Sequence, residues 1–445
     1  MTQPLSWRYM RTKLNLITEI ARKDRKCKFN NLVHLLNVEN FKECFRELKK
    51  GKAAGIDGVT LQEYEQELDN NLEDLVARMK RFSYRPQPAR RVYIPKASGK
   101  KRPLGIPAVE DKIVQMGITK ILQAIFEVDF LDFSYGFRPN RNCHQALETL
   151  DKMIMQRPVN HVIDADIKGF FDNVDHDWLM RCIEQRVSDK NLLRLLKRFL
   201  KAGIVEEGKY LSTEKGTPQG GIISPVLANI YLHYVLDLWF ERVEKQRFGS
   251  YIGMVRYGDD FVICVQRKEV AEQILSELSD RLAKFGLELS GEKTRIVACG
   301  RYARENSRKK GCKPGSFSFL GFTHFCDKGR KGYFKVGRKT DRKKFSVKIK
   351  EMNAWLKAVR NTSKPEAWWP ILAAKLRGHF HYYGISGNYG RISHFYQLTI
   401  RLIFKWLNRR SQKKSHNWEQ FRTYLLRHPL PKPKIYHNLY TLYGC

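Results

Sequence analysis

The sequence predicts an α+β fold organised around a split βαβ sheet. From residue 160 onward, the hydrophobic pattern changes in the order strand, helix, helix, hairpin, helix, strand, which is typical of such a sheet with helices on one side. Residues 1–50, 61–82 and 351–430 instead carry apolar side chains at helical spacing. Hydrophobic residues make up 42% of the 445-residue chain, which provides for packed cores and excludes a mainly disordered protein.

The expected strands follow from short β-type runs. Residues 84–107 contain five prolines around two such runs and predict a β-hairpin with its turn at residues 98–100. Residues 161–167 alternate apolar and acidic side chains as a strand does. Residues 254–263 form two β-runs joined by a polar turn, and a further short β-run is expected at residues 317–322.

Two helices are expected within the βαβ unit. Proline suits the first helical turn, so Pro225 is expected to open a helix that ends near Trp239. Residues 268–285 place apolar side chains on one helical face, and Gly286 marks the end of that helix.

The chain is strongly and unevenly basic. It has 82 lysines and arginines against 46 acidic residues, a net charge of +36. A surplus of this size argues against an ordinary metabolic enzyme and calls for a polyanionic partner, either nucleic acid or an acidic membrane surface. Residues 1–300 have a net charge of only +9, whereas residues 301–445 carry 33 basic and 6 acidic residues, a net charge of +27. The last third is therefore a cationic module.

The cysteines and the hydropathy indicate a cytoplasmic setting. The nine cysteines are scattered and never form a C-x-x-C pair, which argues against a zinc ribbon or a disulfide framework and fits a reducing cytosol. The N-terminus has no secretory signal, and no apolar run of about 18 residues suggests a membrane span. We expect a cytoplasmic protein associated with nucleic acid and not with a membrane.

Aspartates at two predicted strands form the sharpest chemical signal. Asp259 and Asp260 lie at the turn between two hydrophobic runs, and ionised neighbours there need a cation or full hydration. Asp164 and Asp166 share one face of residues 161–167, because side chains alternate along a strand. Two strands that present carboxylates to one point can hold two Mg²⁺ ions about 4 Å apart, with Mn²⁺ as a substitute. The plainer alternative is a pair of solvated strand ends.

Other residues supply parts that a nucleotidyl transfer needs. Lys96 and Arg102 flank the predicted hairpin turn and could reach a triphosphate, unless they are simply solvated. The glycine-rich loop at residues 216–221 lacks the ending of a Walker loop, and Gln219 in it offers a donor and an acceptor. Lys293 could protonate leaving pyrophosphate, although alone it would be an ordinary surface lysine.

The order of motifs carries a family resemblance across residues 50–435. The motifs are GIDGV (55–59), YIPKASGKKRPLGIP (93–107), YGFRPNRN (135–142), ADIKGFFD (165–172), GTPQGGIISP (216–225), RYGDD (256–260), EKT (292–294) and FLGF (319–322). Their order resembles that of group II intron-encoded reverse transcriptases with maturase activity, of the bacterial type without a C-terminal HNH endonuclease domain.

The resemblance implies a right-hand polymerase with fingers, a ferredoxin-like palm and an α-helical thumb, the maturase domain X. The cationic last third, which interleaves lysine and arginine with aromatic residues, would be that thumb. The implied parts are an N-terminal helical extension (1–82), fingers (83–160), a palm with the catalytic carboxylates (161–325), a basic connection (326–350), the thumb (351–430) and a C-terminal tail (431–445).

The resemblance also implies residue roles. The catalytic residues would be Asp166, Asp259, Asp260 and Lys293. The metal ligands would be the three aspartates with the backbone carbonyl of Ile167. The nucleotide-binding residues would be Lys96, Arg102, Phe171 as the steric gate against a ribose 2′-hydroxyl, Pro218, Gln219 and Gly220. The primer grip would be Phe319, Leu320 and Gly321, and Asp164 would be only a hydrated neighbour.

The implied activity is RNA-directed DNA polymerisation, a nucleotidyl transfer that extends a DNA or RNA primer on an RNA template with dNTPs and two Mg²⁺ ions. The implied partners also include structured intron RNA, bound to assist splicing, and target DNA; the choice between monomer and dimer stays open. Three alternatives remain. An RNA-directed RNA polymerase is favoured by Gly258, where the family usually has alanine, but opposed by Phe171. A domesticated relative could act in DNA repair or defence, and a purely RNA-binding maturase would need degenerate catalytic positions.

Overall fold

The computed structural model describes most of the chain: residues 5–95, 101–217, 220–309, 311, 313–329, 332–362, 364–409 and 417–440. The fold is a mixture of helices and strands, as the sequence predicts, and it divides into two compact units. The first unit comprises Met1–Ala146, Ala165–Val262 and Glu269–Arg295, and the second comprises Leu147–Asp164, Ile263–Lys268 and Ile296–Cys445.

The N-terminal part of the first unit is helical, as expected. Its helices are α1 (Leu5–Lys23), α2 (Val38–Glu47), α3 (Leu61–Gln66) and α4 (Leu68–Lys80). Helices α1 and α2 pack on α5 (Val109–Phe126), which is buried on nearly every side. The sequence does not reveal α5 by periodicity, because the polar residues Asp111, Gln115 and Thr119 are buried among its apolar ones and blur the amphipathic repeat.

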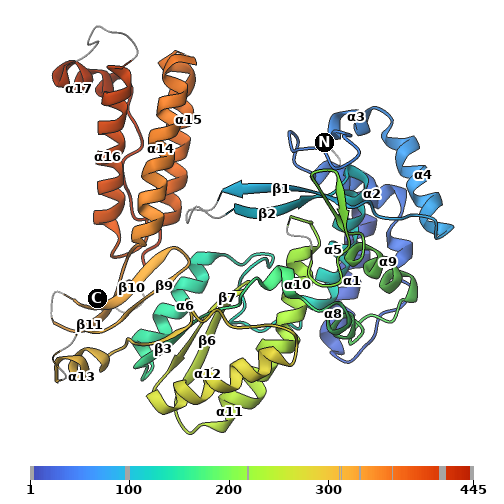
Figure 1. The fold of residues 1–445 in the computed structure, drawn as a ribbon, viewed down its shortest axis with the longest axis horizontal. Helices are drawn as coiled ribbons and strands as arrows, with labels where there is room; N and C mark the ends of the chain where they lie inside the picture. Colours follow the sequence, from blue (N-terminus) through green and yellow to red (C-terminus); the bar gives the residue numbers. More distant parts are fainter. Residues whose placement is uncertain are drawn as a thin grey trace. The chain divides into compact units, whose positions relative to one another are not determined.

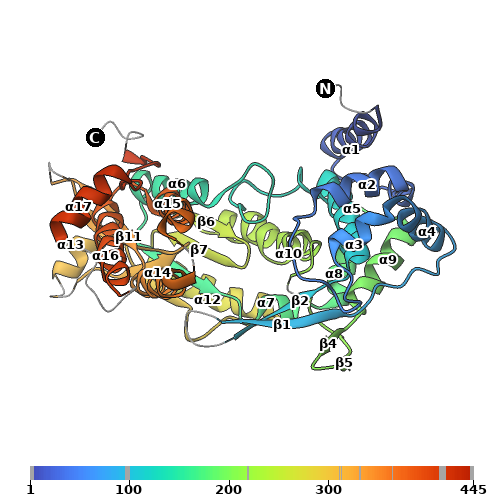
Figure 2. The same cartoon turned by 90° about the horizontal axis from the view of Figure 1, so that it is seen from above.

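The predicted hairpin is present and belongs to a four-stranded sheet. Strands β1 (Ala89–Pro95) and β2 (Lys101–Ile106) are antiparallel, and β1 also pairs in parallel with β4 (Ile204–Glu206), which is followed by β5 (Lys209–Leu211). The strand order is β2-β1-β4-β5, and these strands can be followed in Figure 2. The predicted turn at residues 98–100 lies outside the described residues.

The second four-stranded sheet has the expected split βαβ topology. It consists of β3 (His161–Asp166), β6 (Ile252–Tyr257), β7 (Asp260–Val265) and β8 (Arg295–Ala298), in the order β6-β7-β3-β8. Helix α12 (Lys268–Ala283) connects β7 to β8 in sequence and buries its predicted apolar face. Strands β6 and β7 are almost continuously buried, which follows from their mostly apolar sequences.

The helix predicted from Pro225 to Trp239 is longer and less regular than expected. It begins as α10 (Ser224–Leu232) and stays helical to the end of α11 (Lys245–Arg247). Between them lie two π-helical segments, His233–Asp237 and Phe240–Glu244. The prediction of an end near Trp239 is therefore wrong. Wider π turns rotate the buried face, so the 3.6-residue repeat fades although the helix continues.

The remaining connecting helices complete the fold around these sheets. They are α6 (Cys143–Gln156), α7 (Phe170–Asn173), α8 (His176–Ile183) and α9 (Lys190–Leu200). The sequence predicts no residue range for any of these four helices.

The second unit contains a three-stranded antiparallel sheet, and its first hairpin corrects the sequence prediction. The run at 317–322 is not one strand but two, β9 (Ser316–Phe319) and β10 (Phe322–Lys328). Leu320 and Gly321 form the turn with φ of 49° and 79°. Both values are positive, as a two-residue type I′ hairpin requires, and leucine is an unusual residue there.

The stretch expected to be a basic connection, residues 326–350, is also structured. It contains β11 (Phe334–Thr340) and the start of helix α14 (Arg342–Thr362). On β11, Arg338 occupies a core position: it is fully buried and donates to Asp151 at 2.7 Å. A buried arginine hides the apolar alternation of the strand.

The rest of the second unit is helical. Helix α13 (Ala303–Lys309) precedes β9, and α15 (Pro365–Tyr383), α16 (Tyr389–Leu407) and α17 (Trp418–Arg427) follow α14. Helices α14, α15 and α16 lie side by side (Figure 1). No helix in the described ranges is long and apolar enough to cross a lipid bilayer.

Candidate active site

The turn between β6 and β7 presents two of the predicted carboxylates. Gly258 and Asp259 form this turn, and Asp260 is the first residue of β7. Both aspartates are half-buried. Gly258 has a φ of +68°, a conformation that favours glycine, and a Cβ atom there would lie 2.9 Å from Cε2 of Phe137. The chain therefore turns sharply enough to place Asp259 at the tip.

The third predicted carboxylate, Asp166, ends strand β3. Its backbone carbonyl accepts a hydrogen bond from the Ser290 N–H at 2.8 Å, and its carboxylate lies 2.6 Å from Nζ of Lys293. Ile167 is buried and forms an isolated antiparallel bridge with Leu289. The backbone bond at Ser290 thus brings Lys293 to Asp166 across 127 residues of sequence.

Electrostatics link Asp166 to the β6–β7 turn. Burial is the main cause that raises the pKa of Asp259, and the neighbouring charge of Asp166 raises it further. Its own backbone N–H, and then Arg102 and Lys293, lower this pKa. Charged residues from three other motifs therefore act on the Asp259 carboxylate.

The donor set fits a hard divalent cation. Carboxylate oxygens of Asp166 and Asp259 and the carbonyl of Ile167 are the ligand type that Mg²⁺ prefers, and a half-buried carboxylate beside a like charge gains from a cation. Within the described residues, no three His, Cys, Asp or Glu side chains are gathered as a ready metal cage. The positive charge nearest to Asp166 is that of Lys293.

A buried arginine, which the sequence analysis missed, fastens the turn. Arg256 on β6 is fully buried, and its Nη1 donates to the Gly258 carbonyl at 2.9 Å. Its Nε and Nη2 bind both carboxylate oxygens of Asp237, at 2.7 and 2.5 Å, and Asp237 lies in the first π-helical segment. Two neutral side chains complete the set: Asn229 Oδ1 accepts at 3.2 Å and Ser134 Oγ at 2.7 Å. The sign of this pair in the sequence is a single charged residue, Arg256 or Asp237, in each of two otherwise apolar segments.

The glycine-rich loop is anchored on the α7 region. Thr217 N–H donates to the carbonyl of Phe171, a buried residue of α7, at 2.7 Å. Gly216 has a φ of +88° and donates to the Val174 carbonyl at 2.7 Å. Gly220 has a φ of +109°, and a Cβ atom there would lie 2.6 Å from the carbonyl oxygen of Gly105. Only glycine allows this close approach to β2.

Of the other predicted nucleotide-binding residues, Arg102 is the one that the structure describes. Arg102 is exposed on β2, opposite Ile94. Lys96, Pro218 and Gln219 lie outside the described residues.

The predicted primer grip lies in the β9–β10 hairpin of the second unit. Phe319 is buried at the end of β9, and Leu320 and Gly321 form the turn. The Tyr382 hydroxyl of α15 donates to the Leu320 carbonyl at 3.0 Å, which ties the hairpin to the helices of its own unit.

The tight packing at Gly258 gives a testable prediction. We expect Gly258→Ala to lower the free energy of unfolding by about 1–2 kcal/mol for the left-handed backbone, with a further loss from the Phe137 contact. Gly51→Ala is the matched control, since Gly51 has a φ of +71° and nothing within 4 Å of an added Cβ. Denaturant unfolding of both variants separates the two costs. Equal losses of unfolding free energy in the two variants would show that the Phe137 contact adds no cost.

The geometry of the candidate site indicates the class of protein to which the chain belongs. Paired carboxylates with opposed cations, beside a glycine-rich loop held close to a β-hairpin, suit nucleotidyl transfer. A model of the family described as "Reverse transcriptase (RNA-dependent DNA polymerase)" matches residues 94–324.

Similarity to individual proteins indicates the type of reverse transcriptase. The chain is 30% identical over 441 aligned positions to the group II intron-encoded protein LtrA of Lactococcus lactis subsp. cremoris, which covers 81% of this chain and 71% of that protein. It is 35% identical over 322 positions to protein YkfC of Escherichia coli K12, covering 63% and 84%. It is also 32% identical over 95 positions to nuclear intron maturase 1, mitochondrial, of Arabidopsis thaliana, covering 21% and 13%.

The chain therefore belongs to the reverse transcriptase family, and within it to the group II intron-encoded proteins. It is an RNA-directed DNA polymerase, a nucleotidyltransferase, with maturase function. Membership implies dependence on a divalent metal ion and nucleic-acid partners such as intron RNA. The resemblance expected from the motif order is confirmed, and the alternatives of an RNA-directed RNA polymerase or a repair or defence enzyme are not favoured.

Proposed function

We propose that DNA synthesis takes place at Asp166, Asp259 and Asp260. The observation that carries this proposal is that the neighbouring strands β3 and β7 carry these carboxylates at their ends, with Asp166 2.6 Å from Nζ of Lys293. The three carboxylates and the Ile167 carbonyl would hold two Mg²⁺ ions. When bound, these ions lower the pKa of a primer 3′-hydroxyl and neutralise charge on the triphosphate.

Side chains around the carboxylates would orient the nucleotide. Arg102 is exposed on its strand and would clamp the triphosphate together with Lys96, six residues earlier in the sequence. Lys293 has 65% of its side chain exposed and would donate a proton to the leaving pyrophosphate. Pro218, Gln219 and Gly220 would contact the nucleotide and the templating strand.

We assign the predicted parts of a right-hand polymerase to this chain on the same basis. Residues 83–160 would be the fingers, 161–325 the palm and 351–430 the thumb, whose cationic helices would bind RNA template, primer and structured intron RNA. The hairpin with Phe319, Leu320 and Gly321 would grip the primer, and target DNA would be a further ligand. The protein would work in the cytoplasm on these nucleic acids.

Metal dependence tests the carboxylate assignment. We expect chelation of divalent ions by EDTA to abolish primer extension and either Mg²⁺ or Mn²⁺ to restore it. In Asp166→Asn, the Mg²⁺ concentration for half-maximal extension should rise by at least about tenfold, since one ligand charge is lost. The measurement is a Mg²⁺ titration of extension on an RNA template. An unchanged midpoint in Asp166→Asn would contradict the assignment.

Sugar selection tests the role of Phe171. Its buried ring packs edge-on against Phe170 with 5.3 Å between ring centroids, so its position is fixed. We expect Phe171→Ala to reduce the preference for dNTPs over NTPs by at least about tenfold, because steric exclusion of the 2′-hydroxyl is lost. Phe171→Tyr, which keeps the ring, is the control. The ratio of kcat/KM for the two nucleotides is measured, and a constant ratio in Phe171→Ala would exclude the gate.

A further inference from the structure

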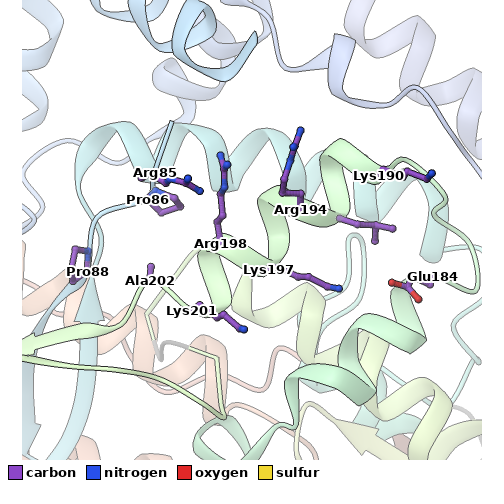
Figure 3. Close-up of a pocket in the computed structure, with 11 residues that line it drawn as sticks. Arg85, Pro86, Pro88, Glu184, Lys190, Arg194, Lys197, Arg198, Lys201 and Ala202 are labelled. Carbon is purple, nitrogen blue, oxygen red and sulfur yellow. The ribbon is translucent and has the colours of Figure 1, made fainter. Parts of the chain in front are cut away.

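A second cationic site lies on helix α9, and no residue of the carboxylate site belongs to it. It is a cleft of about 710 Å³ in the first unit, and we call it the α9 cleft. Its cationic lining residues are Arg85, Lys190, Arg194, Lys197, Arg198 and Lys201. Glu184 is the one acidic residue among its lining residues. Figure 3 shows Arg85, Arg194 and Arg198 extending toward the same side of the helix.

The spacing of the cations follows from the amphipathic character of α9. The helix buries Leu192, Leu195, Leu196, Phe199 and Leu200 on one face. The cations at 190, 194, 197, 198 and 201 occupy the opposite face at helical spacing. Eleven residues at 1.5 Å per residue span about 16 Å. Because a B-form duplex carries one phosphate of each strand per about 3.4 Å of its helix axis, a helix of this length can face several phosphates.

Two cations of the α9 cleft have neutral hydrogen-bond partners. Arg198 donates to the Tyr84 carbonyl at 2.8 Å and Arg194 to Asn191 Oδ1 at 2.7 Å, and both acceptors are neutral. None of the six cations forms a salt bridge with a carboxylate among the described residues. Burial, and then the positive charges of Arg85 and Arg194, lower the pKa of Arg198. A concave group of like charges that repel one another is stabilised by an anionic ligand.

The exposed ring of Phe82 beside the α9 cleft indicates which kind of nucleic acid the cleft favours. The guanidinium carbon of Arg194 lies 3.9 Å from the ring centroid of Phe82, and Phe82 is 45% exposed with a φ of 59°. A guanidinium plane supported on a ring can stack against an unpaired base. A continuous duplex offers phosphates but no unpaired base, so the combination favours folded RNA with loops or bulges.

We propose that the α9 cleft binds a structured RNA, with its cations on backbone phosphates and Arg194 stacked on an unpaired base. The inference deepens the proposed function, since it rests on a structured RNA partner and names the surface that receives it.

The test uses the full-length protein and three probes: an RNA hairpin with a 12-base-pair stem and an eight-nucleotide loop, the same stem as an RNA duplex, and the DNA version of the hairpin. The cleft variant carries Lys190→Gln, Arg194→Gln, Lys197→Gln and Lys201→Gln. The control variant carries Lys26→Gln, Lys80→Gln, Lys209→Gln and Lys284→Gln, four exposed lysines of the same unit outside the cleft. A third variant, Arg194→Lys, keeps the charge but loses the planar group.

We expect the cleft variant to bind the RNA hairpin at least about tenfold more weakly than the control variant, with a salt slope smaller by about three. Arg194→Lys should lose the preference for the hairpin over the duplex. In the wild-type protein, the hairpin should protect Lys190, Lys197 and Lys201 from acetylation, as read by mass spectrometry, and leave the control lysines reactive.

Equal weakening in the cleft and control variants, or no protection of the three lysines, would overturn the α9 cleft as a binding site. Equal losses for the DNA hairpin would overturn its assignment to RNA. Primer extension on a short pre-annealed template is measured in parallel and should be unchanged in the cleft variant. Failure of the wild-type protein to extend any primer would contradict the proposed function while leaving the hairpin measurements to decide the cleft.

Discussion

Asp259→Asn is expected to reduce primer extension by about 10³-fold or more while the protein stays folded. The substitution removes a charge on which the site depends and keeps the shape of the side chain. Burial and Asp166 raise the pKa of Asp259 above its unfolded value, so the ionised carboxylate opposes folding at neutral pH. The asparagine variant should therefore have a melting temperature equal to or above that of the wild-type protein.

The matched control for this variant is Asp164→Asn. Asp164 is half-buried on the same face of β3, two residues from Asp166, and the family resemblance gives it no role. It should keep most of the extension activity. Single-turnover extension on an RNA template compares the two variants. Comparable activity in both would show that the turn carboxylate is not part of the chemistry.

The second large effect is expected at the buried pair formed by Arg256 and Asp237. Arg256→Met leaves the Asp237 carboxylate buried without its partner, which should cost about 3–5 kcal/mol of unfolding free energy. The same change removes the N–H donor to the Gly258 carbonyl, so the turn that carries Asp259 loses its support. Stability and primer extension should both fall, and Arg256→Lys should recover neither in full because lysine cannot bind bidentately.

A double variant separates support of the turn from general stability. Arg256→Met with Asp237→Leu replaces the ion pair by apolar groups and should recover most of the stability, while extension stays low. The control is the same exchange at the other fully buried pair, Arg338→Met with Asp151→Leu, which lies in the second unit. That control should recover stability and keep extension. Recovery of both properties in the Arg256 and Asp237 double variant would limit the pair to a structural role.

Local hydrophobic patterns in the sequence predicted the split βαβ sheet. Alternation at residues 161–167 and the two β-runs around the RYGDD motif correspond to β3, β6 and β7, and the observed strand order follows the expected split βαβ unit. The failures have physical causes. Helix α5 buries polar residues that blur its amphipathic repeat, and π turns hide the length of the helix after Pro225. The buried Arg338 hides the apolar alternation of β11.

The residues of the candidate site that are neighbours in the sequence could be predicted directly. Adjacent aspartates at a turn indicate charge compensation wherever they occur, so Asp259 and Asp260 could be found directly. The pairing of Asp166 with Lys293 spans 127 residues and is not predicted from the sequence. Arg256 and Asp237 could not be predicted, because nothing in the sequence says that two charged residues in apolar segments, 19 residues apart, will bind each other in the core.

The most direct test of the central claim is primer extension on an RNA template with dNTPs and NTPs offered separately, for the wild-type protein and Asp259→Asn. We expect the wild-type protein to incorporate dNTPs in the presence of Mg²⁺, to incorporate NTPs far less well, and Asp259→Asn to incorporate neither. Absence of dNTP incorporation by the wild-type protein, or full incorporation by Asp259→Asn, would contradict DNA synthesis at this site.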